Sequence, residues 1–207
     1  MLHSEILGIY GGTFSPPHLG HRKAAEVFLD AVKPDRLLII PTFLPPHKTF
    51  SSADSPEHRF EMCRLCFGDL PQTEISDLEI RREGKSYTFD TITALSKEGR
   101  EIFFLCGTDM LLTLDHWYRA HELFSLCTFV LERRERDEAT RLMIDERIAF
   151  FRSEYGARIM EIGIEPFEIS STDVRNAAKA GASRALLVTM VPDAVAEYME
   201  AHKLYQS

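Results

Sequence analysis

Short apolar runs alternate with segments of helical periodicity along this chain, and the alternation strongly limits the folds it can adopt. The runs expected to form strands are residues 5–10, 35–42, 74–77, 101–107, 127–134 and 157–164. The segments expected to form helices are residues 18–32, 56 onward, 88–97, 108–126, 133–158, 170–181 and 192 onward. Strands that are apolar along almost their whole length are buried on both faces. The pattern therefore predicts an α/β fold, a parallel sheet covered by helices on both faces, with ligands bound outside the carboxyl ends of the strands.

Length and charge narrow the class of protein. At 207 residues the chain fits one domain, which we place at 1–207. The formal net charge of −8 argues against a nucleic-acid partner, because phosphate contacts need clustered lysines and arginines. No apolar run is long enough to span a membrane, and the first residues lack the pattern of a secretion signal. We therefore expect a cytoplasmic protein without a membrane partner, and the oligomeric state stays open.

The cysteines are expected to be reduced, buried thiols, because all of them lie in apolar stretches: Cys63, Cys66, Cys106 and Cys127. Cys63 and Cys66 form a Cys-x-x-Cys pair inside an expected helix. A zinc site would need a second close pair of ligands, and a redox pair would lie at a strand-to-helix junction. We therefore expect no metal site built from protein ligands.

The segment GIYGGTFSPPHLGH joins the first expected strand to the first expected helix. Gly11 and Gly12 allow the backbone to turn sharply and to approach a ligand closely. His18 and His21 are three residues apart in the first helical turn, so they project from one face. Because a helix start also offers unpaired N–H groups, phosphate oxygens are the natural ligand. The spacing matches neither the dinucleotide fingerprint nor the P-loop, and a glycine turn beside two surface or core histidines stays open as the alternative.

A second helix start, in the segment ISSTDVR, carries a similar signal. Ser170, Ser171 or Thr172 can cap this helix, and Asp173 complements its dipole. Arg175 is not needed for capping, and a positive side chain in the first turn is unfavourable unless an anion lies there too. The mismatch predicts a second phosphate-binding helix start that faces the first.

These segments carry a family resemblance. GGTFSPPHLGH together with ISSTDVR resembles the paired signature of the nucleotidyltransferase superfamily, whose first motif ends in H-x-G-H. The blocks PPHK, SYTFDT, CGTDMLLTLDHW and VPDAVAEYMEAHKLY extend the resemblance, over essentially the whole chain, to the bacterial nicotinate mononucleotide adenylyltransferases. The resemblance implies a Rossmann-like fold. It also implies that the adenylyl group of ATP, used with Mg²⁺, is transferred to nicotinate mononucleotide, giving nicotinate adenine dinucleotide and pyrophosphate in NAD biosynthesis.

The resemblance also assigns roles to residues of this sequence. It makes His18 and His21 the catalytic pair, which would hold the ATP phosphates and stabilise the charged transition state. The other residues that it implies to bind ATP are Gly12, Thr13, Phe14, Asp109, Ser171, Thr172 and Arg175. The residues that it implies to bind nicotinate mononucleotide are Lys48, Thr88, Trp117 and Tyr118. No carboxylate stands out as a general base, and none is needed, because the attacking phosphate is largely ionised near neutral pH.

Some alternatives stay open. From residue type alone, Asp109 is equally a helix cap, Trp117 a core residue and Lys48 a solvated side chain. A pantetheine-phosphate adenylyltransferase or a cytidylyltransferase would share the histidine motif, and a nucleotide-sensing protein would keep the fold without turnover. The chain is too short for a class I aminoacyl-tRNA synthetase. The family most often has an acidic residue after the phenylalanine of the first motif, where this chain has Ser15. The support that a carboxylate would give to this loop is therefore not expected here.

Overall fold

The computed structural model describes residues 4–45, 55–97, 99–133, 135, 137–163 and 169–206. The strands are β1 (Glu5–Gly12), β2 (Arg36–Pro41), β3 (Thr73–Ile75), β4 (Arg100–Gly107), β5 (Thr128–Arg133) and β6 (Arg158–Gly163). The helices are α1 (Leu19–Val32), α2 (Pro56–Phe67), α3 (Leu78–Arg82), α4 (Thr88–Leu95), α5 (Thr108–Leu111), the 3-10 turn η2 (Leu114–His116), α6 (Ala120–Leu126), α7 (Glu138–Tyr155), α8 (Ser171–Lys179), α9 (Arg184–Leu187) and α10 (Asp193–Ala201). Lys48 lies outside the described residues.

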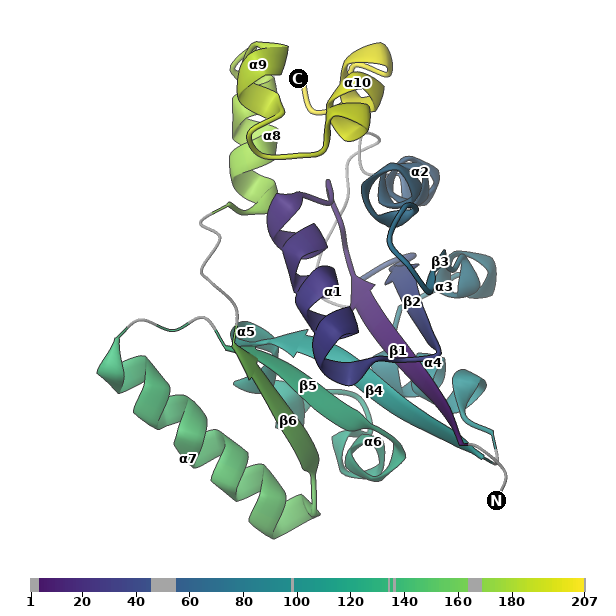
Figure 1. The fold of residues 1–207 in the computed structure, drawn as a ribbon, viewed down its shortest axis with the longest axis vertical. Helices are drawn as coiled ribbons and strands as arrows, with labels where there is room; N and C mark the ends of the chain where they lie inside the picture. The colour runs from purple at the N-terminus through teal and green to yellow at the C-terminus, as the bar shows by residue number, and fades with distance from the viewer. Residues whose placement is uncertain are drawn as a thin grey trace.

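The strands form one sheet in the order β3-β2-β1-β4-β5-β6, and every neighbouring pair is parallel. This is the strand order of the doubly wound, Rossmann-like fold, so the predicted fold class is confirmed. The chain runs outward from β1 to β3 and returns with β4 on the other side of β1 (Figure 1). The order therefore reverses between β1 and β4, and ligands of such sheets bind at the carboxyl ends of those two strands.

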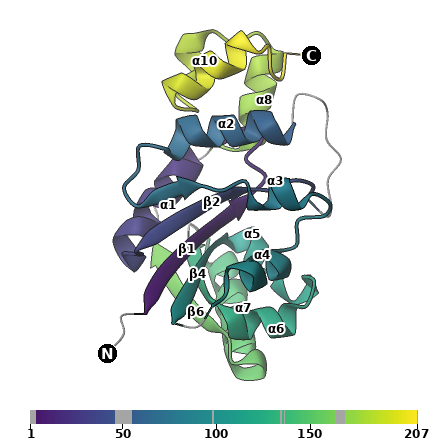
Figure 2. The ribbon, with the colours of Figure 1, turned by 90° about the vertical axis from the view of Figure 1, so that its right-hand side faces the viewer.

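Helices cover both faces of the sheet (Figure 2). One hydrophobic cluster joins the sheet to α1, α2, α8 and α10, and a second joins it to α4, α5, α6 and α7. Strand β2 contributes to both, since Leu37 and Ile39 belong to the first cluster and Leu38 and Ile40 to the second. This two-sided burial is the reason why the strands are apolar at consecutive positions.

Some elements differ from the sequence-based expectation. Helices α3 and α9 were not expected, because helices of 5 and 4 residues are too short to show a helical apolar period. Helix α1 begins at Leu19, one residue later than expected, and His18 is its N-cap. Helix α7 begins at Glu138 rather than at 133, because β5 extends to Arg133 and Asp137 caps the helix.

The four cysteines are free and buried, as the sequence predicts. Cys63 and Cys66 lie on α2 within the first hydrophobic cluster. Burial raises the pKa of the Cys66 thiol to about 12, and it raises the pKa of Cys106 to about 12 as well. Metal binding and redox exchange both require the thiolate, which such surroundings disfavour.

The predictions made from length and composition concern membrane spans, the number of domains and the location of the protein. Within the described segments, no helix combines the length and the hydropathy that crossing a membrane requires. The assignment of residues 1–207 to a single domain and the cytoplasmic location stay predictions.

Candidate active site

The tight turn after β1 is made by Phe14 rather than by the two glycines. Gly11 and Gly12 are the last residues of the strand, and the left-handed backbone conformation belongs to Phe14, whose φ is 49°. A Cβ on Gly12 would lie 2.8 Å from the ring of Phe14, whereas a Cβ on Gly11 would make ordinary contacts at 3.6 Å. The expectation that both glycines form the turn is therefore wrong. Only Gly12 is sterically required there, because the Phe14 ring folds back over it.

His18 and His21 cap each other where this turn meets α1. Nδ1 of His18 accepts a hydrogen bond from the backbone N–H of His21 (3.3 Å), and Nδ1 of His21 accepts one from the N–H of His18 (3.2 Å). The two rings stack with their centroids 3.6 Å apart. An accepting Nδ1 carries no proton, so each neutral ring holds its proton on Nε2. The capping box thus fixes two Nε2–H donors next to each other at a helix start, an arrangement that suits phosphate oxygens.

The start of α8 contacts the loop between β1 and α1. Ser170 is the N-cap of this helix. Ser171 Oγ donates a hydrogen bond to the carbonyl of Pro16 (2.9 Å), and Arg175 Nη1 donates one to the carbonyl of Ser15 (2.7 Å). The two helix starts therefore face each other across this loop.

One cavity of about 410 Å³, which we call the phosphate cavity, lies between the two helix starts. His18, His21, Thr172 and Arg175 all line it, and Arg175 Nη2 donates to Thr172 Oγ1 (2.9 Å). Because α8 begins at Ser171, Arg175 lies just beyond the first turn, and the Ser15 carbonyl accepts a hydrogen bond from it, so the charge mismatch noted in the sequence is weaker than expected. The guanidinium and the imidazoles that share one cavity are the stronger indication of an anion.

A second cavity of about 460 Å³, the middle cavity, is lined by the turn after β1 and by the start of α4. We call this turn, residues 12–14, the phosphate turn. The two cavities share Gly11, Gly12, Phe14, His21, Asp109, Met110 and Ser171. Asp109 is exposed in the first turn of α5, whose N-cap is Gly107. The helix-cap alternative for Asp109 is therefore wrong. Thr13 and Thr88 both line the middle cavity.

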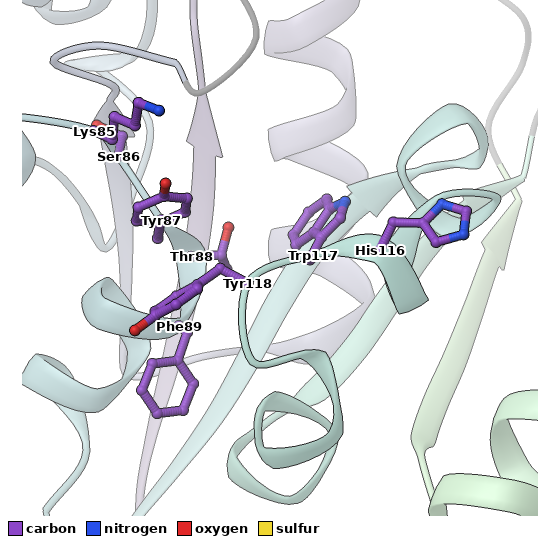
Figure 3. Close-up of a pocket in the computed structure, with 8 residues that line it drawn as sticks. All are labelled: Lys85, Ser86, Tyr87, Thr88, Phe89, His116, Trp117 and Tyr118. Atoms are coloured by element: carbon purple, nitrogen blue, oxygen red, sulfur yellow. The ribbon is translucent and has the colours of Figure 1, made fainter.

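A third cavity of about 580 Å³, the aromatic pocket, lies beyond Thr88 (Figure 3). Its lining residues are Lys85, Ser86, Tyr87, Thr88, Phe89, His116, Trp117 and Tyr118. Thr88 lies between Tyr87 and Trp117 in this view, and the His116 ring points away from them (Figure 3). The ring of Tyr118 is half exposed and lies 4.7 Å from that of Tyr87.

Trp117 belongs to the core and to the pocket at once. Its ring meets Phe104 edge to face, with the centroids 6.3 Å apart, and its indole N–H donates to Thr113 Oγ1 (3.4 Å). It is partly buried and also lines the aromatic pocket. The structure thus brings Thr88, Trp117 and Tyr118 together.

Sequence reasoning missed several residues that line these cavities: Thr42, Glu79, Lys85, Ser86, Tyr87, Met110 and Glu132. Ser86 and Tyr87 stand in the SYT block but received no role. Glu79 and Glu132 gave no signal, because carboxylates are ordinarily expected at the surface.

Ser15 stands where the family most often has an acidic residue, and it is buried in the loop between the two helix starts. We expect Ser15→Asp to keep the turnover number within severalfold of the parent. The structure uses the backbone carbonyl of this residue to hold Arg175, and aspartate retains that carbonyl. The turnover numbers of the parent and the variant at saturating substrate test this, and a collapse of turnover would contradict it.

Comparison with known proteins agrees with this geometry. The sequence model of the cytidylyltransferase-like family matches residues 9–177, which include both helix starts. A probable nicotinate-nucleotide adenylyltransferase of Thermoanaerobacter sp. (strain X514) is 36% identical over 203 residues, which cover 97% of this chain and 94% of the relative. Another, from Geobacter metallireducens, is 37% identical over 215 residues and covers 96% of this chain and 97% of the relative.

The fold is also similar to that of the nicotinic acid mononucleotide adenylyltransferase of Plasmodium falciparum complexed with NaAD. The TM-score is 0.78 with 97% of each chain covered, and at 17% identity this likeness shows the fold. The fold, the paired helix starts and the family match define a nucleotidyltransferase of the cytidylyltransferase-like class. The full-length relatives narrow this further: the chain belongs to the nicotinate-nucleotide adenylyltransferase family.

Proposed function

We propose that this chain transfers the adenylyl group of ATP to nicotinate mononucleotide, giving nicotinate adenine dinucleotide and pyrophosphate in NAD biosynthesis. The observation that carries the proposal is the connection of three cavities along the carboxyl edge of the sheet. The phosphate cavity and the middle cavity share lining residues that include His21, Asp109 and Ser171, and the middle cavity shares Ser86 and Thr88 with the aromatic pocket. An adenine nucleotide and a pyridine nucleotide can therefore lie end to end, with their phosphates beside the helix starts.

In this reaction a phosphate oxygen of the mononucleotide attacks the α-phosphorus of ATP. The bond from that phosphorus to the bridging oxygen breaks, and pyrophosphate leaves. The attacking phosphate is largely ionised near neutral pH, so the protein contributes position and charge stabilisation rather than a base. We assign the charge stabilisation to the Nε2–H donors of His18 and His21.

The remaining ATP contacts follow from the lining of the two cavities. Ser171, Thr172 and Arg175, at the start of α8, are proposed to hold the β- and γ-phosphates. Gly12, Thr13 and Phe14 line the middle cavity together with Ser171, and their backbone is proposed to lie beside the ATP phosphates. Asp109 is proposed to accept hydrogen bonds from the ribose hydroxyls, a role that suits an ionised carboxylate.

Nucleotidyltransferases of this family generally use a divalent metal ion with the nucleotide, and we propose Mg²⁺ here. Among the described residues, no three metal-ligating side chains lie together. Glu132 lines the phosphate cavity, and Mg²⁺ is commonly held by one or two carboxylates together with substrate phosphates. The donor set thus fits an ion that arrives with ATP. Such an ion supplies charge neutralisation to the departing pyrophosphate.

The aromatic pocket is proposed to take the pyridine ring, with Thr88, Trp117 and Tyr118 as its contacts. Helix α4 begins at Thr88 without a side-chain cap, so amide groups of its first turn are available to an anion. Lys85 supplies a basic side chain, and none of the eight lining residues is acidic. These features favour a carboxylate over an uncharged amide on the ring. Lys48, outside the described residues, stays a prediction.

Replacing Trp117 by leucine should raise the KM for nicotinate mononucleotide about tenfold or more, because stacking on an aromatic ring is worth ~1–3 kcal/mol. Trp117→Phe retains a ring and should raise it less. The KM for ATP should not change in either variant. Steady-state kinetics with each substrate varied in turn tests this, and an equal rise in both KM values would contradict the stacking role.

The proposed activity is tested by pyrophosphate release from ATP and Mg²⁺ with three acceptors: nicotinate mononucleotide, nicotinamide mononucleotide and phosphopantetheine. We expect strong release with the nicotinate acceptor. Release only with another acceptor would retain the phosphate cavity but contradict the role of the aromatic pocket. No release with any acceptor would favour a nucleotide-sensing protein.

A further inference from the structure

A cluster of buried and partly buried polar side chains lies beside the middle cavity, outside the residues assigned so far. Its members are Arg59 on α2, Glu79 and Arg82 on α3, Ser86, and Thr91 on α4. We call it the Arg59–Glu79 cluster. Arg59 is fully buried, and Glu79, Ser86 and Thr91 are buried as well. Helix α3 lies between α2 and α4 in both views of the fold, so the cluster joins three helices (Figures 1 and 2).

Arg59 ties together the loops that follow β1 and β2. Its Nη1 donates to the carbonyl of Thr13 (2.9 Å), in the phosphate turn. Its Nη2 donates to the carbonyl of Phe43 (3.0 Å), just beyond β2. A planar guanidinium with its donors in a fixed fork sets the spacing of two carbonyls. The phosphate turn and the loop after β2 are therefore held in register.

The loop after β2 is tied in turn to the segment before α4. The backbone N–H of Phe43 donates to Ser86 Oγ (2.9 Å), and the N–H of Ser86 donates to the carbonyl of Leu44 (2.9 Å). Ser86 directly precedes Tyr87 and Thr88, which line the aromatic pocket. A continuous path of hydrogen bonds thus runs from the phosphate turn to the pocket that we assign to the mononucleotide.

Glu79 fixes α4 itself. The hydroxyl of Thr91 donates to Glu79 Oε1 (2.5 Å) and accepts from Arg82 Nη2 (3.1 Å). Burial raises the pKa of Glu79, and hydrogen bonds from Thr91 and Ser86 act against this rise. Thr91 lies in the second turn of α4, directly after the turn that faces the aromatic pocket.

The hydrogen bonding of this cluster is incomplete. Glu79 Oε2 and Arg82 Nη1 are buried without a hydrogen-bond partner among the described residues. Well-packed apolar side chains at such positions are often at least as stable as a buried ionic cluster. Because Glu79, Ser86 and Thr91 line the middle cavity, this cluster points to a contribution to the site as well as to folding.

We propose that Glu79 is a positioning residue for the mononucleotide: acting through Thr91, it holds the first turn of α4 in place beside the aromatic pocket. The inference rests on the proposed function for the identity of the ligand. The phosphate turn is held separately by the contacts of Ser171 and Arg175 with its loop. Loss of Glu79 should therefore weaken mononucleotide binding and spare ATP binding.

The test uses Glu79→Gln and Thr91→Val, which keep the size of each side chain and remove the charge or the hydroxyl. Trp117 is the single tryptophan of the chain and lines the pocket, so its fluorescence reports nicotinate mononucleotide binding without turnover. We expect the Kd from this titration to rise about fivefold or more in each variant, and the double variant to be no worse than the poorer single one, as for coupled neighbours. The KM for ATP should stay at the parent value.

Glu135→Gln is the matched control. Glu135 is also a shielded carboxylate that accepts from a threonine hydroxyl, Thr108 Oγ1 (2.6 Å), and pairs with an arginine, Arg133 (3.2 Å). It lies beyond β5, away from the aromatic pocket. We expect the Kd for nicotinate mononucleotide to be unchanged in this variant.

The outcomes separate the inference from the proposed function. An unchanged Kd in both cluster variants, or an equal loss of ATP and mononucleotide affinity, would overturn the positioning role. If Glu79→Gln does not fold, Thr91→Val alone decides between these results. A parent chain that binds nicotinate mononucleotide but releases no pyrophosphate contradicts the proposed function, and the fluorescence titration still tests the cluster.

Discussion

Replacing His18 or His21 by asparagine should lower the turnover number about a hundredfold or more, the effect of losing a preorganised donor that stabilises transition-state charge. The choice of asparagine follows from the capping box, in which Nδ1 of each histidine accepts a backbone N–H. Asparagine Oδ1 occupies the same place in the side chain as Nδ1 of histidine, and at position 18 asparagine is itself a favoured N-cap residue. The substitution therefore removes the Nε2–H donor and keeps the helix start. Pyrophosphate release at saturating ATP and nicotinate mononucleotide measures the effect.

His18→Ala is the informative comparison, because alanine removes the cap as well as the donor. Losing an N-cap costs about 1 kcal/mol. For a chain of this size that corresponds to a fall in the melting temperature of roughly 2–4 °C. We expect the alanine variant to show this fall and the asparagine variant to melt near the parent temperature. Parent-like turnover in His18→Asn and His21→Asn would rule out the proposed site.

Replacing Arg175 by methionine should raise the KM for ATP about tenfold to a hundredfold, since hydrogen bonds to charged groups are worth ~1.5–3 kcal/mol. Arg175 lines the phosphate cavity with both histidines, and its Nη1 also holds the carbonyl of Ser15. The KM for nicotinate mononucleotide should change much less. Steady-state kinetics with each substrate varied measures both values.

Arg184→Met is the control for the loss of one positive charge. Arg184 lies on α9 and pairs with Asp193 and Glu197 at the surface, away from the three cavities. We expect its KM for ATP to match the parent. If Arg175→Met also matched the parent, the role of Arg175 would be limited to holding the loop at Ser15.

The order of elements could be read from the sequence because it depends on local pattern. Strand β2 is apolar at consecutive positions and was recognised as buried on both faces before any packing was known. The two helix starts were recognised from His18, His21 and Arg175. A parallel sheet places the carboxyl ends of its strands at one edge, so both helix starts are expected at that edge, and the structure has this arrangement.

Other features depend on contacts between distant residues. The turn expected at the glycines is made by Phe14, which has the left-handed conformation and whose ring packs back over Gly12. The sequence does not decide whether Trp117 is a core residue or a pocket residue. In the structure it is both, because its ring contacts Phe104 and also lines the aromatic pocket.

The sequence by itself thus determined the α/β class, the edge of the sheet that binds ligands and the residue types that meet phosphate, because hydrophobic periodicity and helix-start chemistry are local. Only the tertiary structure decided the tautomer of the two histidines and the partner of Arg175 at Ser15. It alone revealed the burial of Arg59 and Glu79, since a charged side chain is expected in water until the folded chain supplies its hydrogen-bond partners.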